Sequence, residues 1–151
     1  MMIFALRHAD RVSETIDALS DKGKVRAKLL ARMLAQSGIT NAYCSDARRA
    51  QDTVAPLKEL LGAALKVDVV PFGSGGAAGH AQAVITALKA LPADSVAAVV
   101  GHSNTIDLII KGLTNKAIAP IGAIEFDKLF VLSIPAGSPG WTLLRYGAPT
   151  P

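Results

Sequence analysis

The chain has 151 residues, of which half are hydrophobic and 19% are charged, and its net charge is +4. This length suits one domain, predicted to span residues 1–151, and the apolar content argues against disorder. No stretch approaches the roughly 18 consecutive apolar residues of a membrane helix. Arg7 interrupts the apolar N-terminus too early for a signal-peptide core. We therefore expect a cytoplasmic protein without a membrane partner, unless a leader precedes this sequence.

The basic excess is concentrated between residues 22 and 28, where Lys and Arg alternate with other residues along a predicted helix. A solvated helix face accounts for this pattern better than nucleic-acid binding does, because few aromatic residues accompany it. The single cysteine, Cys44, excludes an internal disulfide and any multi-cysteine metal site, and its apolar surroundings predict a buried structural thiol. We expect no nucleic-acid partner, no metal and no cofactor, and the oligomeric state stays open.

Strand and helix patterns alternate along the chain. In the first half, the predicted elements are a strand over 3–6, a helix from Ser20 to about Gln36, a strand over 41–44 and a helix from Asp46 to near Gly62. In the second half they are a strand over 66–70, a glycine-rich loop over 72–79, a helix over 81–91, a strand over 95–100, a helix from around Ser103 to Gly112 or Leu113, and strands over 128–134 and 141–146 joined by a turn over 135–140. Ser20, Asp46 and Ser103 stand where side chains that cap helices are expected.

This alternation predicts an α/β protein, a three-layer α/β/α sandwich with a mainly parallel central sheet. In such sheets, ligands bind beyond the carboxyl ends of the strands. His8, Ser45 and His102 follow the first, second and fourth predicted strands. The topology therefore gathers three distant segments into one candidate site.

The residue types at this site suit phosphoryl transfer. A neutral imidazole is nucleophilic near pH 7, so His8 or His102 can attack phosphorus. Arg7 and Arg49 offer forked donors that match phosphoryl oxygens. His102 also precedes a predicted helix N-terminus, which favours an anion. Each residue alone has an ordinary structural explanation, and only their joint placement predicts a phosphate site.

Four motifs, in this order, resemble those of the histidine phosphatase superfamily, the phosphoglycerate-mutase-like branch, and in particular its small phosphohistidine-phosphatase-type members. They are Arg7-His8-Ala9, Leu19-Ser20-Asp21-Lys22-Gly23, Ser45 to Thr53 with Asp52 where Gln or Glu is usual, and Gly101-His102. The resemblance implies a phosphoglycerate-mutase-like fold and metal-independent hydrolysis. It also implies that His8 becomes phosphorylated. Its implied phosphoryl-binding residues are Arg7, Arg49 and His102, with Ser103 and Asn104 as further donors.

One feature of the family pattern is missing. Many members carry a carboxylic acid that protonates the leaving oxygen, but the interval from Val69 to Ala93 holds no Asp or Glu. His80 is either a substitute general acid or an exposed histidine near a helix start. Asp10 and Asp107 lie nearer the motifs but match no acid position of the family.

The missing acid affects the expected substrate. A phosphoramidate nitrogen can leave already protonated, so a phosphohistidine on a protein is favoured narrowly over a phosphorylated small molecule. The short interval between Arg49 and His102 predicts an open site, which disfavours mutase activity. A phosphate-binding module with little turnover is the alternative function. A nucleotide-binding regulatory domain has weak support, because Gly73-Ser74-Gly75-Gly76 lacks the lysine of a P-loop.

Overall fold

The computed structural model describes residues 1–135 and 137–151. A six-stranded sheet forms its centre. The strands are β1 (Met2–Arg7), β2 (Asn41–Cys44), β3 (Lys66–Val69), β4 (Val96–Gly101), β5 (Lys128–Ser133) and β6 (Gly140–Arg145). The helices are α1 (Asp21–Leu34), α2 (Arg48–Leu61), α3 (Gly76–Lys89) and α4 (Ile106–Thr114), with a short 3-10 helix over Gly62–Ala64.

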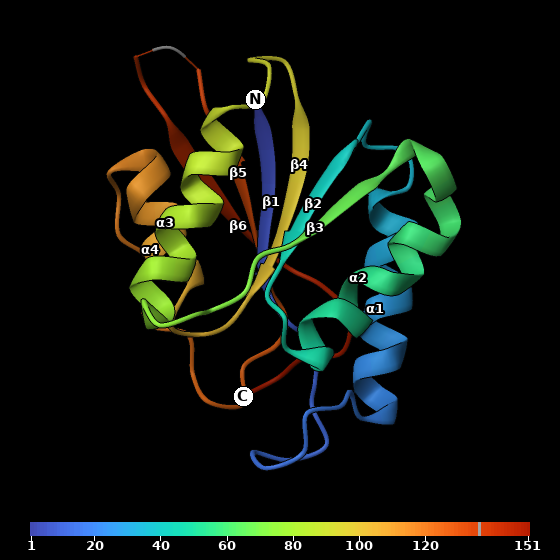
Figure 1. Ribbon diagram of the computed structural model, residues 1–151. Coiled ribbons are helices and arrows are strands. Elements are labelled where there is room, and N and C mark those ends of the chain that lie inside the picture. Colours follow the sequence, from blue (N-terminus) through green and yellow to red (C-terminus); the bar gives the residue numbers. More distant parts are fainter. Residues whose placement is uncertain (136) are drawn as a thin grey trace.

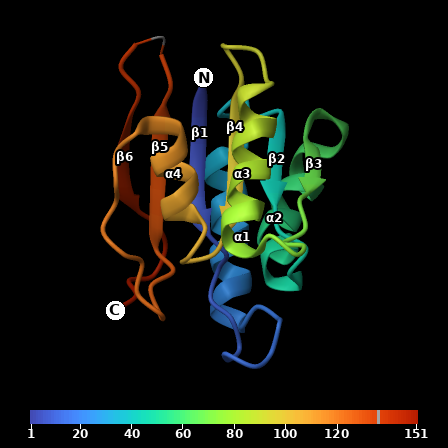
Figure 2. The same cartoon turned by 60° about the vertical axis from the view of Figure 1, so that its left-hand side comes forward.

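The strand order is β3-β2-β4-β1-β5-β6, which can be followed from right to left in Figure 2. The first four strands of the chain pair in parallel, whereas β5 runs antiparallel to β1 and β6 antiparallel to β5. Helices α1 and α2 cover one face of the sheet, and α3 and α4 cover the other (Figure 1). The predicted three-layer fold with a mainly parallel sheet is confirmed.

Alternation along β1 divides the apolar core between the two faces of the sheet. Ile3 and Ala5 pack with residues of α3 and α4, whereas Phe4 and Leu6 pack with residues of α1 and α2. This is the period of two that a strand covered on both faces requires. Cys44 lies in the second of these cores with 1% of its surface exposed, and burial raises its pKa to about 11. The prediction of a structural thiol is confirmed.

Helix starts separate the correct predictions from the wrong ones. Ser20 caps α1 as predicted, because its Oγ accepts a hydrogen bond from the Gly23 amide at 3.1 Å. The prediction that Asp46 caps α2 is wrong: the cap position is Ala47, and no side chain at that position bonds the helix. Asp46 instead accepts the Phe72 amide at 3.4 Å.

Two further helix starts were misplaced. The cap position of α4 is Thr105 rather than Ser103, so His102 and the helix are separated by a turn. Helix α3 begins at Gly76 and includes half of the segment predicted as a glycine-rich loop. Glycine disfavours helices intrinsically, but packing of Ala81 and Val84 in the core outweighs that preference.

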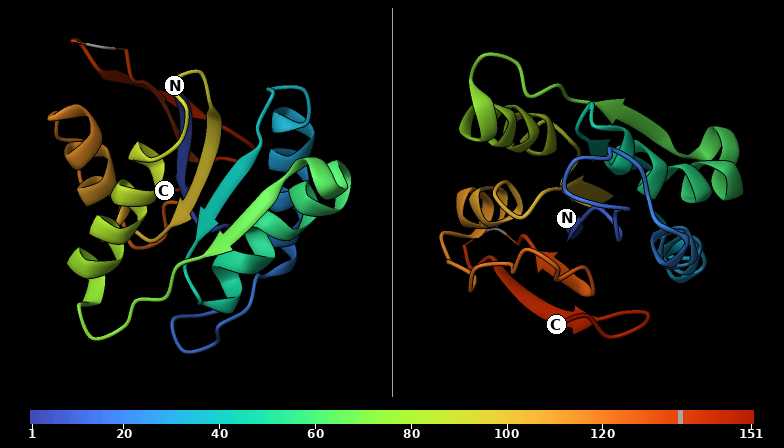
Figure 3. Two further views of the ribbon diagram at one scale, coloured as in Figure 1. Left: turned by 45° about the horizontal axis from the view of Figure 1, so that its top comes forward. Right: turned by 90° about the horizontal axis from the view of Figure 1, so that it is seen from below.

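The carboxyl ends of β1, β2 and β4 lie at the same edge of the sheet, because these three strands are parallel neighbours. Figure 3 shows this edge from below, with the segments that follow the strands gathered around it. The candidate residues therefore begin from a common edge. Among residues 1–135 and 137–151, no helix has the length and apolar character needed to cross a membrane.

Candidate active site

His8 is positioned by the end of β1. Its amide donates to the Gly101 carbonyl at 2.9 Å, which continues the pairing of β1 with β4. The next amide, of Ala9, donates at 2.9 Å to the Oγ1 of Thr53, which in turn donates to the Arg49 carbonyl at 2.8 Å. The Thr53 hydroxyl thus joins the His8 segment to the first turns of α2.

A close approach between two backbones holds the segment after His8. A Cβ at Gly23 would lie 2.0 Å from the Asp10 carbonyl oxygen, so no larger residue fits there. The Asp10 carboxylate accepts a 2.6 Å hydrogen bond from Arg26 Nε, in an ion pair that is almost wholly buried. Arg26 also donates to the carbonyls of Tyr146 and Ala148. Helix α1 and the C-terminal segment therefore support the loop that carries His8.

His102 is held by a turn at the end of β4. Its amide donates to Thr105 Oγ1 at 2.9 Å, and a Cβ at Gly101 would lie only 2.7 Å from that hydroxyl. The His102 Nε2 lies 2.7 Å from Ser45 Oγ, which also accepts the Ala47 amide. The glycine before His102 and the serine that opens the second motif thus both orient one imidazole.

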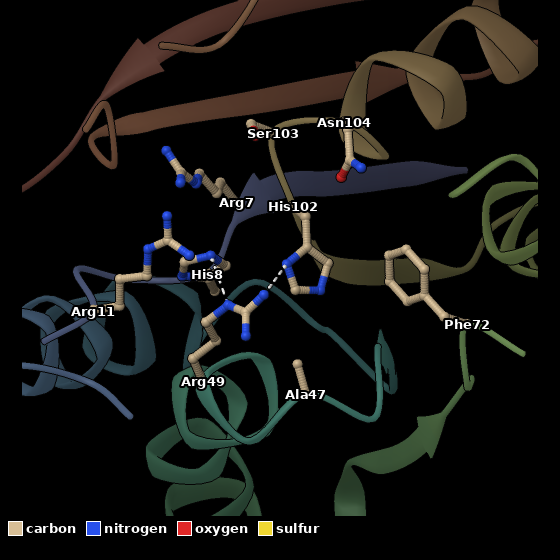
Figure 4. Close-up of a pocket in the computed structure, with 9 residues that line it drawn as sticks. All are labelled: Arg7, His8, Arg11, Ala47, Arg49, Phe72, His102, Ser103 and Asn104. Atoms are coloured by element: carbon tan, nitrogen blue, oxygen red, sulfur yellow. Dashed lines mark hydrogen bonds between the residues drawn. The ribbon is translucent and has the colours of Figure 1, made fainter. Parts of the chain in front are cut away.

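The two imidazoles meet at the guanidinium of Arg49. Its Nε donates to His8 Nε2 at 3.2 Å, and its Nη2 lies 3.3 Å from His102 Nδ1 (Figure 4). Its Nη1 forms a 2.9 Å ion pair with Asp17. A guanidinium only donates hydrogen bonds, so both ring nitrogens that face it are acceptors.

This constraint assigns the tautomers. In His8, the proton lies on Nδ1, which donates to the Ala9 carbonyl at 2.8 Å and leaves the Nε2 lone pair directed at Arg49. In His102, the proton lies on Nε2 and is donated to Ser45. Both rings are neutral and both present a lone pair to the same place.

The electrostatics of the site favour these neutral forms. Burial, reinforced by Arg7 and other neighbouring cationic groups, lowers the pKa of His8 to about 3, and only the hydrogen bond to Ala9 opposes this. Burial and Arg49 lower the pKa of His102 to about 4. Both imidazoles therefore keep their lone pairs at neutral pH.

Arg7 is fixed by a cluster of contacts after α4. Its Nη1 donates to the carbonyls of Gly122 and Glu125, and its guanidinium lies 4.2 Å from the centre of the Phe126 ring. Burial, Arg11 and Arg49 lower its pKa to about 10, so it stays charged at neutral pH. Its Nε is buried without a hydrogen-bond partner among the described residues. Arg7 therefore has one donor that no described group of the protein satisfies.

These side chains surround a cavity of about 420 Å³. Its lining residues are Arg7, His8, Arg11, Ala47, Arg49, Phe72, His102, Ser103 and Asn104. Six of the seven candidate residues come together here, and only His80 does not. Three lining residues are arginines, and within the described part of the chain no lining residue is acidic. Such a pocket suits an anion with several oxygens.

His80 lies outside this lining. It is 1% exposed, on α3, so its interpretation as an exposed histidine is wrong. Its Nδ1 bonds the Val70 carbonyl, and its ring stacks at 4.7 Å on Phe72, whose other neighbour is the His102 ring at 5.3 Å. Burial lowers its pKa. A neutral imidazole behind Phe72 has no route to a leaving group in the pocket, so the geometry argues against the general-acid role.

Two residues that line or support the pocket, Arg11 and Asp17, were not predicted from the sequence. Arg11 follows His8 by three residues, and this short spacing was the available signal. Asp17 accepts the backbone amides of Arg48 and Arg49 at 2.9 and 3.0 Å, so it caps α2 from a distant loop. No local pattern marks such a contact. No group of three His, Cys, Asp or Glu side chains is arranged to hold a metal ion in the described residues.

Comparisons with known proteins agree with this geometry. Residues 6–71, which include His8, Asp17 and Arg49, match the model of the histidine phosphatase superfamily (branch 1). A comparison with curated protein sequences found no match. The segment that carries the first three motifs is therefore similar in sequence to the histidine phosphatase superfamily.

Several solved structures share the whole fold. A protein histidine phosphatase SixA in complex with tungstate has a TM-score of 0.72 at 16% identity, over 96% of this chain and 97% of that one. A putative phosphohistidine phosphatase SixA from Nakamurella multipartitia has a TM-score of 0.66 at 23% identity, over 98% and 95%. A mycobacterial glucosyl-3-phosphoglycerate phosphatase with inorganic phosphate has a TM-score of 0.67 at 21% identity, over 98% and 97%.

Proposed function

We propose that this protein is a metal-independent phosphatase in which His8 is the nucleophile and a phosphohistidine is the intermediate. One observation carries the proposal: the free lone pairs of His8 Nε2 and His102 Nδ1 converge on the Arg49 guanidinium. They do so in a pocket whose lining includes Arg7 and Arg11 and no acidic residue of the described chain. Fixed donors around one nucleophilic nitrogen are what phosphoryl transfer requires.

Binding begins with an exchange of acceptors. Phosphoryl oxygens replace the imidazole lone pairs as the acceptors of Arg49, which frees His8 Nε2 to face phosphorus. Arg7 Nε is a second donor without a competing protein partner in the described chain. Ser103 and Asn104 lie on the pocket wall, where their side chains are further donors. A bound anion also favours protonated His102, which then donates from Nδ1 while Nε2 keeps its bond to Ser45.

The reaction proceeds in two balanced steps. The Nε2 lone pair of His8 forms a bond to phosphorus as the bond to the leaving oxygen or nitrogen breaks, and the leaving group keeps the electron pair and takes a proton from solvent, unless it arrived protonated. Water then attacks phosphorus, the phosphorus–nitrogen bond breaks, and its electron pair returns to Nε2. Inorganic phosphate leaves, and the attacking water loses its proton to solvent.

The absence of an acidic lining residue among those described bears on the leaving group. An alkoxide needs a proton as it departs, an aryl oxide needs it less, and a phosphoramidate nitrogen can arrive protonated. We therefore infer a preference for phosphoramidate and aryl phosphate over alkyl phosphate. The similar structures include phosphohistidine phosphatases, and protein phosphohistidine is our favoured substrate. A cytoplasmic location and a single catalytic domain over residues 1–151 complete the proposal.

The deciding experiment compares turnover of a phosphohistidine peptide, an aryl phosphate and an alkyl phosphate by the wild type and by His8→Ala. We expect phosphate release to depend on His8 and to be fastest from the phosphohistidine peptide, slower from the aryl phosphate and slowest from the alkyl phosphate. Quenching at neutral pH and mass spectrometry would place the transferred phosphoryl group on His8. Phosphate binding without turnover of any of the three compounds overturns the proposal. Brisk alkyl phosphate turnover overturns the leaving-group argument alone.

A further inference from the structure

The pocket holds one more cation than a single phosphoryl group uses. Arg49 donates a hydrogen bond to the His8 imidazole itself. Arg7 packs on the ring of Phe126, which is a neighbour of His8. Arg11 lines the same cavity, and Figure 4 shows its side chain extending toward His8 and Arg7. Its charge is the strongest cationic influence on Arg7, where it adds to the effect of burial in lowering that pKa.

Arg11 has a fixed position but little charge compensation. Its backbone pairs with Leu19 in an isolated bridge, and the next residue, Val12, donates to the Ala18 carbonyl at 3.0 Å, so the base of the loop is closed. Its ion-pair partner, Glu14, is 82% exposed and lies 3.9 Å away, which is a weak solvated pair. Only 20% of the Arg11 side chain is exposed. A largely buried arginine side chain with so weak a partner favours a further anion.

Charge balance points the same way. A phosphoryl dianion is matched by Arg7, Arg49 and the His102 imidazole that protonates when the anion binds, once the Asp17 carboxylate is set against Arg49. No described lining residue offers a carboxylate to Arg11. A substrate that brings only a phosphoryl group leaves Arg11 with the exposed Glu14 as its counterpart.

We propose that Arg11 binds a second anionic group of the substrate, a carboxylate or a second phosphoryl group, beside the phosphoryl group at His8. This inference rests on the proposed function and narrows its substrate class to phosphorylated molecules or phosphopeptides with an acidic group near the phosphorylated atom. A guanidinium binds a carboxylate or a phosphoryl group through two parallel hydrogen bonds, so it fixes the orientation of the anion as well as attracting its charge. Arg11 therefore selects the substrate, and His8 performs the chemistry.

The test uses pairs of substrates that differ in one charge. Meta- and para-carboxyphenyl phosphate are compared with the matching carbamoylphenyl phosphates, which have nearly the same shape and similar leaving groups. We expect the wild type to have a kcat/KM about 10- to 100-fold higher for the better carboxylate isomer, as one charge-assisted hydrogen-bonded pair supports. Meta-phenylene bisphosphate distinguishes a phosphoryl group from a carboxylate as the second anion.

Three variants locate the effect. Arg11→Gln should reduce the preference for the charged compound to within about threefold, and Arg11→Lys should retain part of it. Arg48→Gln removes an exposed arginine of α2 that pairs with Asp52, and should keep the full preference. The preference should also weaken with added salt.

Several results overturn the inference and leave the phosphatase proposal intact. They are equal kcat/KM for charged and neutral compounds in the wild type, a preference that survives Arg11→Gln, or a loss in Arg11→Gln that is the same for both compounds, which would make Arg11 part of the phosphoryl site. Calorimetric binding of the same compounds to His8→Ala, with and without Arg11→Gln, tests Arg11 without any turnover. Loss of turnover alone, with charge-dependent binding kept, overturns only the phosphatase proposal.

Discussion

The carboxylate of Asp17 holds Arg49 by its backbone and by its side chain at once. One oxygen accepts the Arg49 amide at 3.0 Å and the guanidinium Nη1 at 2.9 Å, while the other accepts the Arg48 amide at 2.9 Å. Partial burial opposes ionisation of Asp17, but these hydrogen bonds outweigh it and lower its pKa. The loop after β1 therefore sets both the start of α2 and the direction of the guanidinium that joins the two histidines.

Asp17→Ala should weaken substrate binding and stability together. Two amides at the start of α2 lose their acceptor, at a cost of about 0.5–2 kcal/mol, and the Arg49 side chain loses one of its three anchors. We expect KM to rise more than kcat falls, with lower stability in urea. Asp52→Ala, which breaks the Arg48–Asp52 pair on the same helix, is the matched control and should change neither KM nor kcat. Unchanged kinetics in Asp17→Ala would show that the helix alone orients Arg49.

Arg49→Ala should cost about 10²–10³ in kcat/KM, as the loss of one donor to a developing anion commonly does. Its neighbour Arg48 is exposed and does not line the cavity, so Arg48→Ala should stay within about twofold of the wild type. Steady-state kinetics with an aryl phosphate measures both. Similar losses in the two variants would mean that general positive charge, rather than the Arg49 contacts, supports the reaction.

Stability should decline as the pH falls below neutrality. All three histidines of the chain are buried, and burial lowers the pKa of each, to about 3 for His8 and about 4 for His102. Unfolding restores pKa values near 6.5, so the unfolded chain binds more protons in acid. The stabilisation is complete above about pH 6.5 and is lost progressively toward the folded pKa values, by up to about 1.4 kcal/mol per pH unit for each histidine.

Urea unfolding between pH 7.5 and pH 4.5 measures this slope. Replacement of His8 or His102 by Gln should reduce the slope by about one proton, and replacement of His80 should also reduce it, whatever each change does to the stability at pH 7.5. A wild-type free energy of unfolding that stays constant over this range would mean that the histidines protonate in the folded state.

The order of strands and helices and the location of the site were predictable from the sequence. Buried strands such as β4 consist of a short apolar run, and α1 carries its own cap in Ser20, so both are marked by neighbouring residues. His8, Arg49 and His102 were predictable as site residues because each lies at the carboxyl end of a strand or in the next helical turn. Local patterns and parallel topology together were enough to bring them to one edge.

Contacts between distant segments were not predictable in this way. Asp17 caps a helix that begins 31 residues later, and Phe72 seats His80 behind the pocket through ring packing. The glycines before His80 predicted a loop, because helix propensity is local, whereas the core contacts that form α3 are tertiary. The sequence therefore predicts where the chemical groups lie but not which groups hold or shield them.

Thr53→Val should lower both stability and activity. Valine keeps the shape of this fully buried side chain but leaves the Ala9 amide without its acceptor, at a cost of about 1–3 kcal/mol. Because Ala9 follows His8, we also expect a lower kcat. Thr86→Val is the matched control: Thr86 makes the same bond to the carbonyl four residues earlier, but on the exposed face of α3. Equal effects of the two variants would indicate that the helix bond, not the bond to Ala9, is what Thr53 contributes.

Gly23→Ala should displace the segment after His8, because Gly23 of α1 packs against its backbone. A Cβ at this position would lie 2.0 Å from the Asp10 carbonyl oxygen and 2.9 Å from its carbon, which are backbone atoms that cannot rotate away. Either α1 or the loop two residues after His8 must move, so we expect a loss of about 1–3 kcal/mol in stability and a lower kcat/KM. Urea unfolding and aryl phosphatase kinetics measure the two effects.

Gly79→Ala is the same chemical change as Gly23→Ala, but we expect it to stabilise the protein. Gly79 lies inside α3, its φ is not positive, and a Cβ there would meet no atom within 4 Å. Alanine should therefore raise the free energy of unfolding by about 0.5–1 kcal/mol and leave kcat/KM unchanged. A Gly23→Ala protein as stable and as active as Gly79→Ala would show that α1 can shift without disturbing Asp10, and would remove α1 from the support of His8.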